Sequence, residues 1–328
     1  MSQSPAFTTS NDAAVSEDQT HDVALLQLGR RLQADGYQFT TVTPLTHQRN
    51  NQREDNRQAR DLRGIFGWNR PFESQLLPDA ELKALLGSGV IRAHAGLWIS
   101  DVRWSSLRDS LFVHSGFPTV AQDSVFFGPD TYRFAQAIEE HLRISTHPIC
   151  TAVDIGCGSG AGAILIAKAR HDAQVLALDI NPTALRFTAV NAALAETENV
   201  SAWHSDLLDS ASGDFDLIVA NPPYMQDSQK RAYRHGGERL GSALSVRIVE
   251  QAIHRLTPGG SLVLYTGAPW IDGVDLFLEH ARPIVDLPGF TWSYREVDPD
   301  VFGEELETEN YTQAERIAAV VLTVTRLS

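Results

Sequence analysis

The segment 214–224 constrains the fold more than any other part of the chain. It contains an apolar run of strand length, residues 215–220, and ends in Asn221-Pro-Pro-Tyr224. Two adjacent prolines lack backbone N–H groups and fix two φ angles, so they cannot continue a central strand. We therefore expect a buried strand that leaves its sheet stiffly at Asn221. In open α/β sheets ligands bind beyond the carboxyl ends of the strands, so this point marks a candidate site.

Strand and helix signals alternate from Phe117 to the end of the chain. Asn181 followed by Pro182 marks a typical helix start, because Asn caps helices and Pro is favoured at the first helical position. Alternating strands and helices are typical of βαβ units, so we expect an α/β fold in which helices cover both faces of a parallel sheet. The strands are expected at residues 150–155, 175–178, 200–204, 215–220, 261–266 and 317–325, and the helices at 160–169, 182–195 and 243–256.

The first part of the chain, residues 21–115, shows a weaker pattern. Asp22 is expected to cap a helix that carries leucines on one face and ends before Gly36. A second helix is expected at 79–87. The order of a helix followed by a hairpin predicts a smaller mixed α+β domain, similar to a winged helix, before a second domain at 116–328. The expected strand runs of the first domain are 90–91, 97–99 and 111–114.

The composition is that of an ordinary globular protein. It is 43% hydrophobic and 21% charged, and no apolar run reaches membrane length. Residues 1–20 are rich in Ser, Thr, Asp and Gln and lack the apolar core of a signal peptide, so we interpret them as a disordered tail of a cytoplasmic protein. Cys150 and Cys157 lack zinc-ligand spacing, so we expect reduced structural thiols and no metal.

The formal net charge of −14 argues against a partner that is recognised mainly through the phosphates of duplex nucleic acid. One segment has a positive net charge although the chain as a whole is acidic, because five arginines recur there at near-helical spacing. They form either a solvated helix face or a basic face for an acidic protein or for RNA. The arginines are Arg49, Arg53, Arg57, Arg60 and Arg63, interrupted by Glu54, Asp55 and Asp61.

A glycine-rich segment, Asp154-Ile-Gly-Cys-Gly-Ser-Gly160-Ala161, lies between the first strand and helix of the second domain. Glycines let the backbone pass close to a ligand and turn tightly into a helix, whose free N–H groups then face that ligand. The segment also satisfies the looser G-x-G-x-x-A dinucleotide pattern, with Asp179 at the distance of a ribose-binding carboxylate. The loop alone therefore leaves a nicotinamide cofactor and S-adenosylmethionine open.

Three other residues favour S-adenosylmethionine. Asp154 stands just before the glycines, where it would repel a pyrophosphate but attract the cationic methionyl end of this methyl donor. Asp206, after the third strand, can accept a hydrogen bond from an adenine amino group. Asn221 ends the fourth strand with a motif that has no role in hydride transfer.

The Asn-Pro-Pro-Tyr motif suits a planar –NH2 acceptor, either a carboxamide or the exocyclic amine of a base. The Asn221 side-chain oxygen and the Pro222 carbonyl can each accept one N–H, and Tyr224 can stack on the planar group. These contacts would hold the nitrogen lone pair toward the methyl group. Catalysis would then depend on positioning and on exclusion of water, without a strong base.

Together these motifs resemble the class I S-adenosylmethionine-dependent methyltransferases. The resemblance covers about 117–328 and rests on 154–160, on 179–185 with Asn191-Ala192 after it, and on 221–224. Within the class the chain is most similar to the HemK-like protein-glutamine N5-methyltransferases, which act on release factors or a ribosomal protein. Pro129-Asp130-Thr131, and Gly236-Gly237 with Leu240, support this subgroup.

The resemblance implies a seven-stranded Rossmann-like sheet that is parallel except for its last strand. The first domain would recognise the substrate. The residues assigned to S-adenosylmethionine are Thr131, Asp154, Gly156, Cys157, Gly158, Gly160, Asp179, Ile180, Asp206, Leu207 and Asn221, and those assigned to the acceptor and catalysis are Asn221, Pro222 and Tyr224.

The chain departs from the HemK-like pattern where acceptors are chosen. Its first domain does not read as a helical bundle, and the usually acidic segment after Asn-Pro-Pro-Tyr here contains Lys230, Arg231 and Arg234. A glutamine of a translation-related protein is the expected acceptor. An adenine-N6 or guanine-N2 base of RNA or DNA, and a donor-binding interaction module without turnover, are the alternatives. The acidic run 298–309 is expected to be a solvated hairpin near the pocket, or to bind a basic substrate segment.

Overall fold

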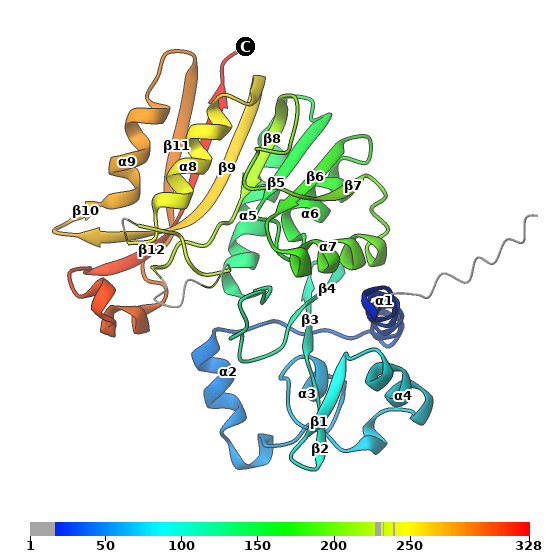
Figure 1. The fold of residues 1–328 in the computed structure, drawn as a ribbon. Coiled ribbons are helices and arrows are strands. Elements are labelled where there is room, and N and C mark those ends of the chain that lie inside the picture. The colour runs from blue at the N-terminus through cyan, green and yellow to red at the C-terminus, as the bar shows by residue number, and fades with distance from the viewer. Residues whose placement is uncertain (1–16, 227–230, 232, 239) are drawn as a thin grey trace, which may run out of the picture.

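The second part of the chain is built on one large sheet. The computed structural model describes residues 17–226, 231, 233–238 and 240–328. In this part of the chain seven strands form a continuous path in the order β11-β12-β9-β8-β5-β6-β7, and the short strand β10 pairs with β9 (Figure 1). Their bounds are β5 Thr151–Ile155, β6 Gln174–Asp179, β7 Val200–His204, β8 Phe215–Ala220, β9 Leu256–Ile271, β10 Val274–Asp275, β11 Phe290–Asp298 and β12 Arg316–Arg326.

Strand direction confirms the predicted class I architecture. The neighbours β7, β6, β5, β8 and β9 are all parallel. The final strand β12 is antiparallel to both β9 and β11, so only this strand of the seven is reversed. The carboxyl ends of β5, β6, β7 and β8 consequently lie at one edge of the sheet, where the predicted site residues follow them.

Helices cover both faces of this sheet, as the alternation predicts. One apolar core joins the sheet to α8 and α9, and another joins its opposite face to α5 and α6. Helix α8 ends at Ile253, so Leu256, which the sequence placed on that helix, instead begins β9. Asn181 caps α7 by accepting a hydrogen bond from the Thr183 N–H. The helix bounds are α5 Pro129–Ile144, α6 Ala161–Ala169, α7 Pro182–Leu194, α8 Ala243–Ile253 and α9 Leu276–Val285.

The first part of the chain is a mixture of helices and two hairpins beside the sheet domain (Figure 1). The predicted helix at 79–87 is α4, and the predicted hairpin after it is β1 with β2. Strand β3, which pairs with β4, was not predicted. The bounds are α1 Glu17–Ala34, α2 Pro44–Asn51, α3 Leu62–Phe66, α4 Asp79–Gly87, β1 Ile91–His94, β2 Leu97–Ser100, β3 Val102–Leu107 and β4 Ser110–Ser115.

Two predictions for this region were wrong in detail. Helix α1 begins at Glu17, so Asp22 lies inside it and does not cap it, and residues 17–20 are helical. The rest of the predicted tail, 1–16, lies outside the described residues. The arginine-rich segment does not form one helix face, because the chain divides into α2, a 3-10 turn at Glu54–Asn56 and α3.

Within the described ranges, no helix combines the length and apolar character needed to span a membrane.

The two parts of the chain share a hydrophobic core through α7. Residues of α7, among them Phe187 and Leu194, pack with buried residues of α1 and β4. Asn191, on the same helix, is fully buried; its amide donates to the carbonyl oxygens of Val113 and Ser159, at 3.1 and 2.9 Å, and its oxygen accepts the Val113 N–H at 2.8 Å. One side chain therefore joins β4 to the glycine-rich loop.

The substitution Asn191→Ala should lower the free energy of unfolding by about 2–4 kcal/mol, because it leaves three buried backbone groups without partners. The matched control is Asn199→Ala. Asn199 is half-buried directly before β7, and its amide donates to the carbonyl oxygens of Arg170 and Ala173. This substitution should lower the free energy of unfolding by less than about 1 kcal/mol. Urea unfolding followed by circular dichroism measures both losses. Equal losses in the two variants would contradict the importance given to the Asn191 bridge.

Candidate functional site

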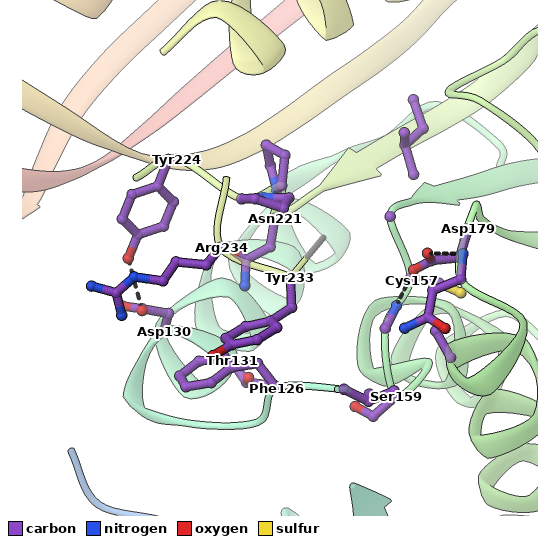
Figure 2. Close-up of a pocket in the computed structure, with 18 of the residues that line it drawn as sticks. Phe126, Asp130, Thr131, Cys157, Ser159, Asp179, Asn221, Tyr224, Tyr233 and Arg234 are labelled. Atoms are coloured by element: carbon purple, nitrogen blue, oxygen red, sulfur yellow. Dashed lines mark hydrogen bonds between the residues drawn. The ribbon is translucent and has the colours of Figure 1, made fainter. Parts of the chain in front are cut away.

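A cavity of about 220 Å³ lies at the carboxyl ends of the parallel strands (Figure 2). It brings together residues from the glycine-rich loop, the ends of β6 and β8, the turn after β7 and the start of α5. These segments are separated in sequence, and the parallel sheet delivers them to one edge. The predicted site residues that line the cavity are Thr131, Asp154, Gly156, Cys157, Gly158, Asp179, Ile180, Asp206, Leu207, Asn221, Pro222 and Tyr224.

Gly160 is the predicted residue that does not line the cavity. It has a φ of +80° and stands directly before α6. A Cβ atom at this position would lie 2.8 Å from Cγ2 of Thr188 on α7. The turn and the packing of α7 are therefore sufficient to require glycine at this position.

Gly156 and Gly158 differ from Gly160 because they open toward the cavity. Both have positive φ angles, +68° and +55°, and a Cβ atom on either would meet open space. The loop is held in place by Asp179 at the end of β6, whose Oδ2 accepts the Gly158 N–H at 2.9 Å. Its Oδ1 accepts the Asn181 N–H, also at 2.9 Å. The loop backbone is thereby exposed to a ligand and still fixed in position.

Asp154 is the most deeply buried carboxylate at the edge of this cavity, with 1% of its surface exposed. Its Oδ2 accepts the Ala163 N–H in the first turn of α6 at 2.9 Å. Burial, with the negative charge of Asp179 nearby, raises the pKa of Asp154 to about 7. A cation placed in the cavity would stabilise the charged form of this group.

Asp206 belongs to the turn after β7 and is exposed. Its carboxylate lies 3.7 Å from the Arg247 guanidinium, a separation that leaves its oxygens accessible to another donor. Leu207, the next residue, has a φ of +50° and is buried, so the turn directs Asp206 outward while Leu207 packs inward.

The Asn221 carboxamide lines the cavity at the end of β8. Among the described residues, none forms a hydrogen bond with this carboxamide or with the Pro222 carbonyl oxygen. Two hydrogen-bond acceptors from consecutive residues therefore lie at the cavity without a donor from the described part of the chain. This arrangement can receive a planar –NH2 group that brings two N–H donors.

Tyr224 is more enclosed than a freely stacking ring would be. It is 6% exposed, and its hydroxyl donates to Oδ2 of Asp130 at 2.7 Å (Figure 2). A Cβ atom at Gly267 would lie 2.3 Å from the Tyr224 ring, so the ring packs directly on the backbone of β9. Burial first, and then the charge of Asp130, raises the pKa of Tyr224 well above its usual value.

Four aromatic residues at the cavity were not predicted: Phe126, Phe134, Tyr233 and Phe302. Phe126 and Tyr233 stack with ring centres 6.3 Å apart and planes at 9°, and the Tyr233 hydroxyl donates to the Thr119 carbonyl at 2.6 Å. Phe302 lies 6.0 Å from the Tyr224 ring. No short motif marks these residues, because tertiary packing brings them together from three separate segments.

The charged segments near the cavity partly neutralise each other. Arg234 forms an ion pair with Glu305 of the acidic run, and the Arg231 guanidinium lies over the Tyr233 ring. Lys230 lies outside the described residues. The acidic run contains two short 3-10 helices, Gly303–Glu307 and Glu309–Tyr311, and Phe302 directly before them lines the cavity.

Comparison with known proteins identifies the family. The family model "Methyltransferase small domain" matches residues 134–268. The release factor glutamine methyltransferase of Rhodopirellula baltica is 36% identical over 146 residues, which cover 40% of this chain and 49% of that protein. The enzyme of the same name from Deinococcus radiodurans is 34% identical over 220 residues, covering 62% of this chain and 75% of that protein.

The alignments do not cover all relatives equally. The matching enzyme of Lactococcus lactis is 32% identical over 164 residues, which are 57% of its length, so the chain spans about half the length of several relatives. A solved structure of Trm5b from Pyrococcus abyssi shares 17% identity, with a TM-score of 0.49, over 73% of this chain and 62% of that one. The extent of the Deinococcus match shows that the chain belongs to the release factor glutamine methyltransferase (HemK) family of class I methyltransferases.

Proposed function

We propose that this chain is an S-adenosylmethionine-dependent N-methyltransferase whose acceptor is the side-chain amide of a glutamine in a translation-related protein. The main support is a pair of hydrogen-bond acceptors, the Asn221 carboxamide oxygen and the Pro222 carbonyl, that have no donor among the described residues. They lie at the cavity that also contains the glycine-rich loop and four aspartates. An acceptor of this kind would place the activity in the cytoplasm.

The residues around the loop fit S-adenosylmethionine. When bound, this molecule supplies a methyl group carried on a positively charged sulfonium. Gly156 and Gly158 leave open space where side chains would otherwise stand. Asp154 would attract the cationic methionyl end, Asp179 would accept from ribose hydroxyls, and Asp206 would accept from the adenine amino group.

Asn221 and Pro222 would act on the acceptor. An amide nitrogen is a poor nucleophile because its lone pair is delocalised into the carbonyl group. If the two oxygens accept its two N–H groups, the nitrogen lone pair is turned toward the donor pocket in a fixed orientation. Phe126, Tyr224 and Phe302 supply apolar walls that limit water. The amide nitrogen becomes more acidic as it is alkylated, so its proton can leave to solvent without a dedicated base.

The name of the relatives supports a glutamine acceptor, because each is called a release factor glutamine methyltransferase.

A nucleic-acid base is the second candidate for the methyl acceptor, and one specific observation supports it. The exposed side chains of Arg49, Arg53, Arg57 and Arg63 have no salt-bridge partner among the described residues. Such a surface suits phosphates.

Labelled methyl transfer into an extract of cells that lack this protein separates the candidates. We expect label that is sensitive to protease and resistant to nuclease, and located on a glutamine side-chain nitrogen by peptide mass spectrometry. Label lost on nuclease treatment would assign the second candidate. Donor binding without any transfer would indicate a binding module instead of an enzyme.

Replacing Asn221 by Ala should lower turnover by about 10²–10³-fold, by analogy with the loss of one oriented polar group in other active sites. Affinity for S-adenosylmethionine should remain close to that of the unaltered chain. Steady-state transfer rates and calorimetry measure the two quantities. Asn199→Ala, outside the cavity, is the control and should keep full turnover. Undiminished turnover in Asn221→Ala would refute the role given to this carboxamide.

Donor affinity should rise with pH and level off above about 7, because the ionised form of Asp154 attracts the cation and its pKa is about 7. Below that pH each unit should weaken binding by up to about tenfold, since a proton must first be released. Calorimetry from pH 5.5 to pH 8.5 (conditions spanning about 1.5 units on either side of the pKa) measures the effect. Asp206→Asn should keep this slope and Asp154→Asn should abolish it. A flat profile in the unaltered chain would show that Asp154 does not contact the cation.

A further inference from the structure

Asp130 is a buried carboxylate that the proposed chemistry does not use. It is the second residue of α5 and is 4% exposed. Its Oδ2 accepts the Tyr224 hydroxyl at 2.7 Å, and its Oδ1 accepts the Tyr265 hydroxyl at 2.6 Å. Figure 2 shows the first of these bonds joining α5 to the segment that follows β8. A buried carboxylate is costly to keep unless its oxygens are satisfied, and here each oxygen has a donor.

A guanidinium completes the surroundings of Asp130. Arg133, one turn later on α5, lies 3.2 Å from Oδ1, and its second nitrogen donates to Asp298 Oδ2 at 2.6 Å. The groups that face Asp130 are therefore Tyr224, Tyr265 and Arg133, with Asp298 behind the arginine. Because all three neighbours can donate, they favour the ionised carboxylate as a pure acceptor.

The position of Tyr224 determines where the hydrogen-bond-accepting oxygens of Asn221 and Pro222 lie. Tyr224 is joined to Asn221 through Pro222 and Pro223, whose rings fix two consecutive φ angles. At the start of this segment Asn221 is fixed by the end of β8, and at the other end Tyr224 is fixed by Asp130 and by the backbone of Gly267. A short stiff segment held at both ends has little freedom to move the Pro222 carbonyl or the Asn221 carboxamide.

The same carboxylate is also linked to the part of the cavity wall that carries Phe302. Asp298 ends β11, and four residues later Phe302 lines the cavity with a φ of +56°. The contacts run from Asp130 through Arg133 to Asp298, so α5, the Asn-Pro-Pro-Tyr segment and the wall that carries Phe302 are tied to a single group.

We propose that Asp130 is a positioning residue of the methyl-transfer site. Acting through Tyr224 it sets the acceptor oxygens of Asn221 and Pro222, and acting through Arg133 and Asp298 it sets the Phe302 wall. This inference rests on the proposed function. A carboxylate with a purely structural role would affect stability but would leave the rate of the folded enzyme unchanged.

A matched pair of residues elsewhere in the sheet domain provides the control. Asp275 is buried, caps α9 by accepting the Leu278 N–H at 2.9 Å and also accepts the Tyr294 hydroxyl. Neither residue lines the cavity. The pair therefore reproduces the chemistry of Asp130 and Tyr224, an aspartate near a helix start bonded to a tyrosine, at a distance from the site.

The experiment compares Tyr224→Phe, Asp130→Asn and the double variant with Tyr294→Phe and Asp275→Asn. It measures kcat and KM for the methyl acceptor, the Kd for S-adenosylmethionine and the melting temperature. We expect kcat to fall by about 10- to 100-fold in each of the first two variants, because a small displacement of positioned groups is enough for such a loss. The Kd should stay within about twofold, and the double variant should lose no more than the worse single variant, since both remove one interaction. The control variants should lower only the melting temperature.

Several outcomes would overturn the inference. An unchanged kcat in Tyr224→Phe, multiplied losses in the double variant, or equal kcat losses in the control pair would each show that Asp130 does not act through Tyr224. If Asp130→Asn does not fold, Tyr224→Phe decides alone, because it keeps the ring and the carboxylate. An unaltered chain that binds the donor but transfers no methyl group would instead refute the proposed function, so the two failures are distinguishable.

Discussion

β8 lies in the middle of the sheet, between β5 and β9, and the two prolines that follow it determine the direction in which the chain leaves the sheet. Proline cannot pair with a neighbouring strand, so pairing stops at Ala220 and the next residues turn over the carboxyl edge. The same edge receives the glycine-rich loop after β5 and Asp179 at the end of β6, because these strands are parallel. The cavity follows from this convergence, and the direction of the acceptor oxygens follows from the prolines.

The central features of the sheet could be predicted from the sequence because buried parallel strands have continuous apolar runs. Strand β11 could not be placed in this way. Its residues alternate between half-buried and exposed, as suits a strand at the sheet edge, and its polar side chains hide the strand signal. Helix α9 contains Pro283, which obscured it in the same manner. The family resemblance implied seven strands with the last one reversed, but it did not locate β11 in the sequence.

In the candidate site, likewise, residues in short motifs could be predicted from the sequence, and residues positioned by tertiary packing could not. Residues within short motifs, such as Asp154 and Asn221, could be assigned because the motif itself fixes their place relative to a strand end. The enclosed position of Tyr224 could not, because it depends on Gly267 and Asp130, which are distant in sequence. Gly160 was assigned to the donor because it belongs to the glycine pattern, whereas its neighbour Thr188 explains why it is glycine.

The first part of the chain is linked to the donor side of the cavity as well as to the acceptor side. Asn191 bonds both β4 and the glycine-rich loop, and the Asp123 carbonyl accepts from Asn181 beside Asp179. Segment 117–126 then contributes Thr119 and Phe126 to the cavity and is bonded to Tyr233. A substrate that docks on this part of the chain would therefore contact elements that also shape the donor site, which offers a physical route for selecting the acceptor.

The central claim is that the cavity at the carboxyl edge of the sheet holds S-adenosylmethionine beside Asn221. Its most direct test is a structure of the full chain crystallised with S-adenosylhomocysteine, the product that remains after methyl transfer. We expect the adenine near Asp206, the ribose at Asp179 and the sulfur facing the Asn221 carboxamide. Density for the molecule at another place, or a cavity that stays empty at saturating concentration, would contradict the claim.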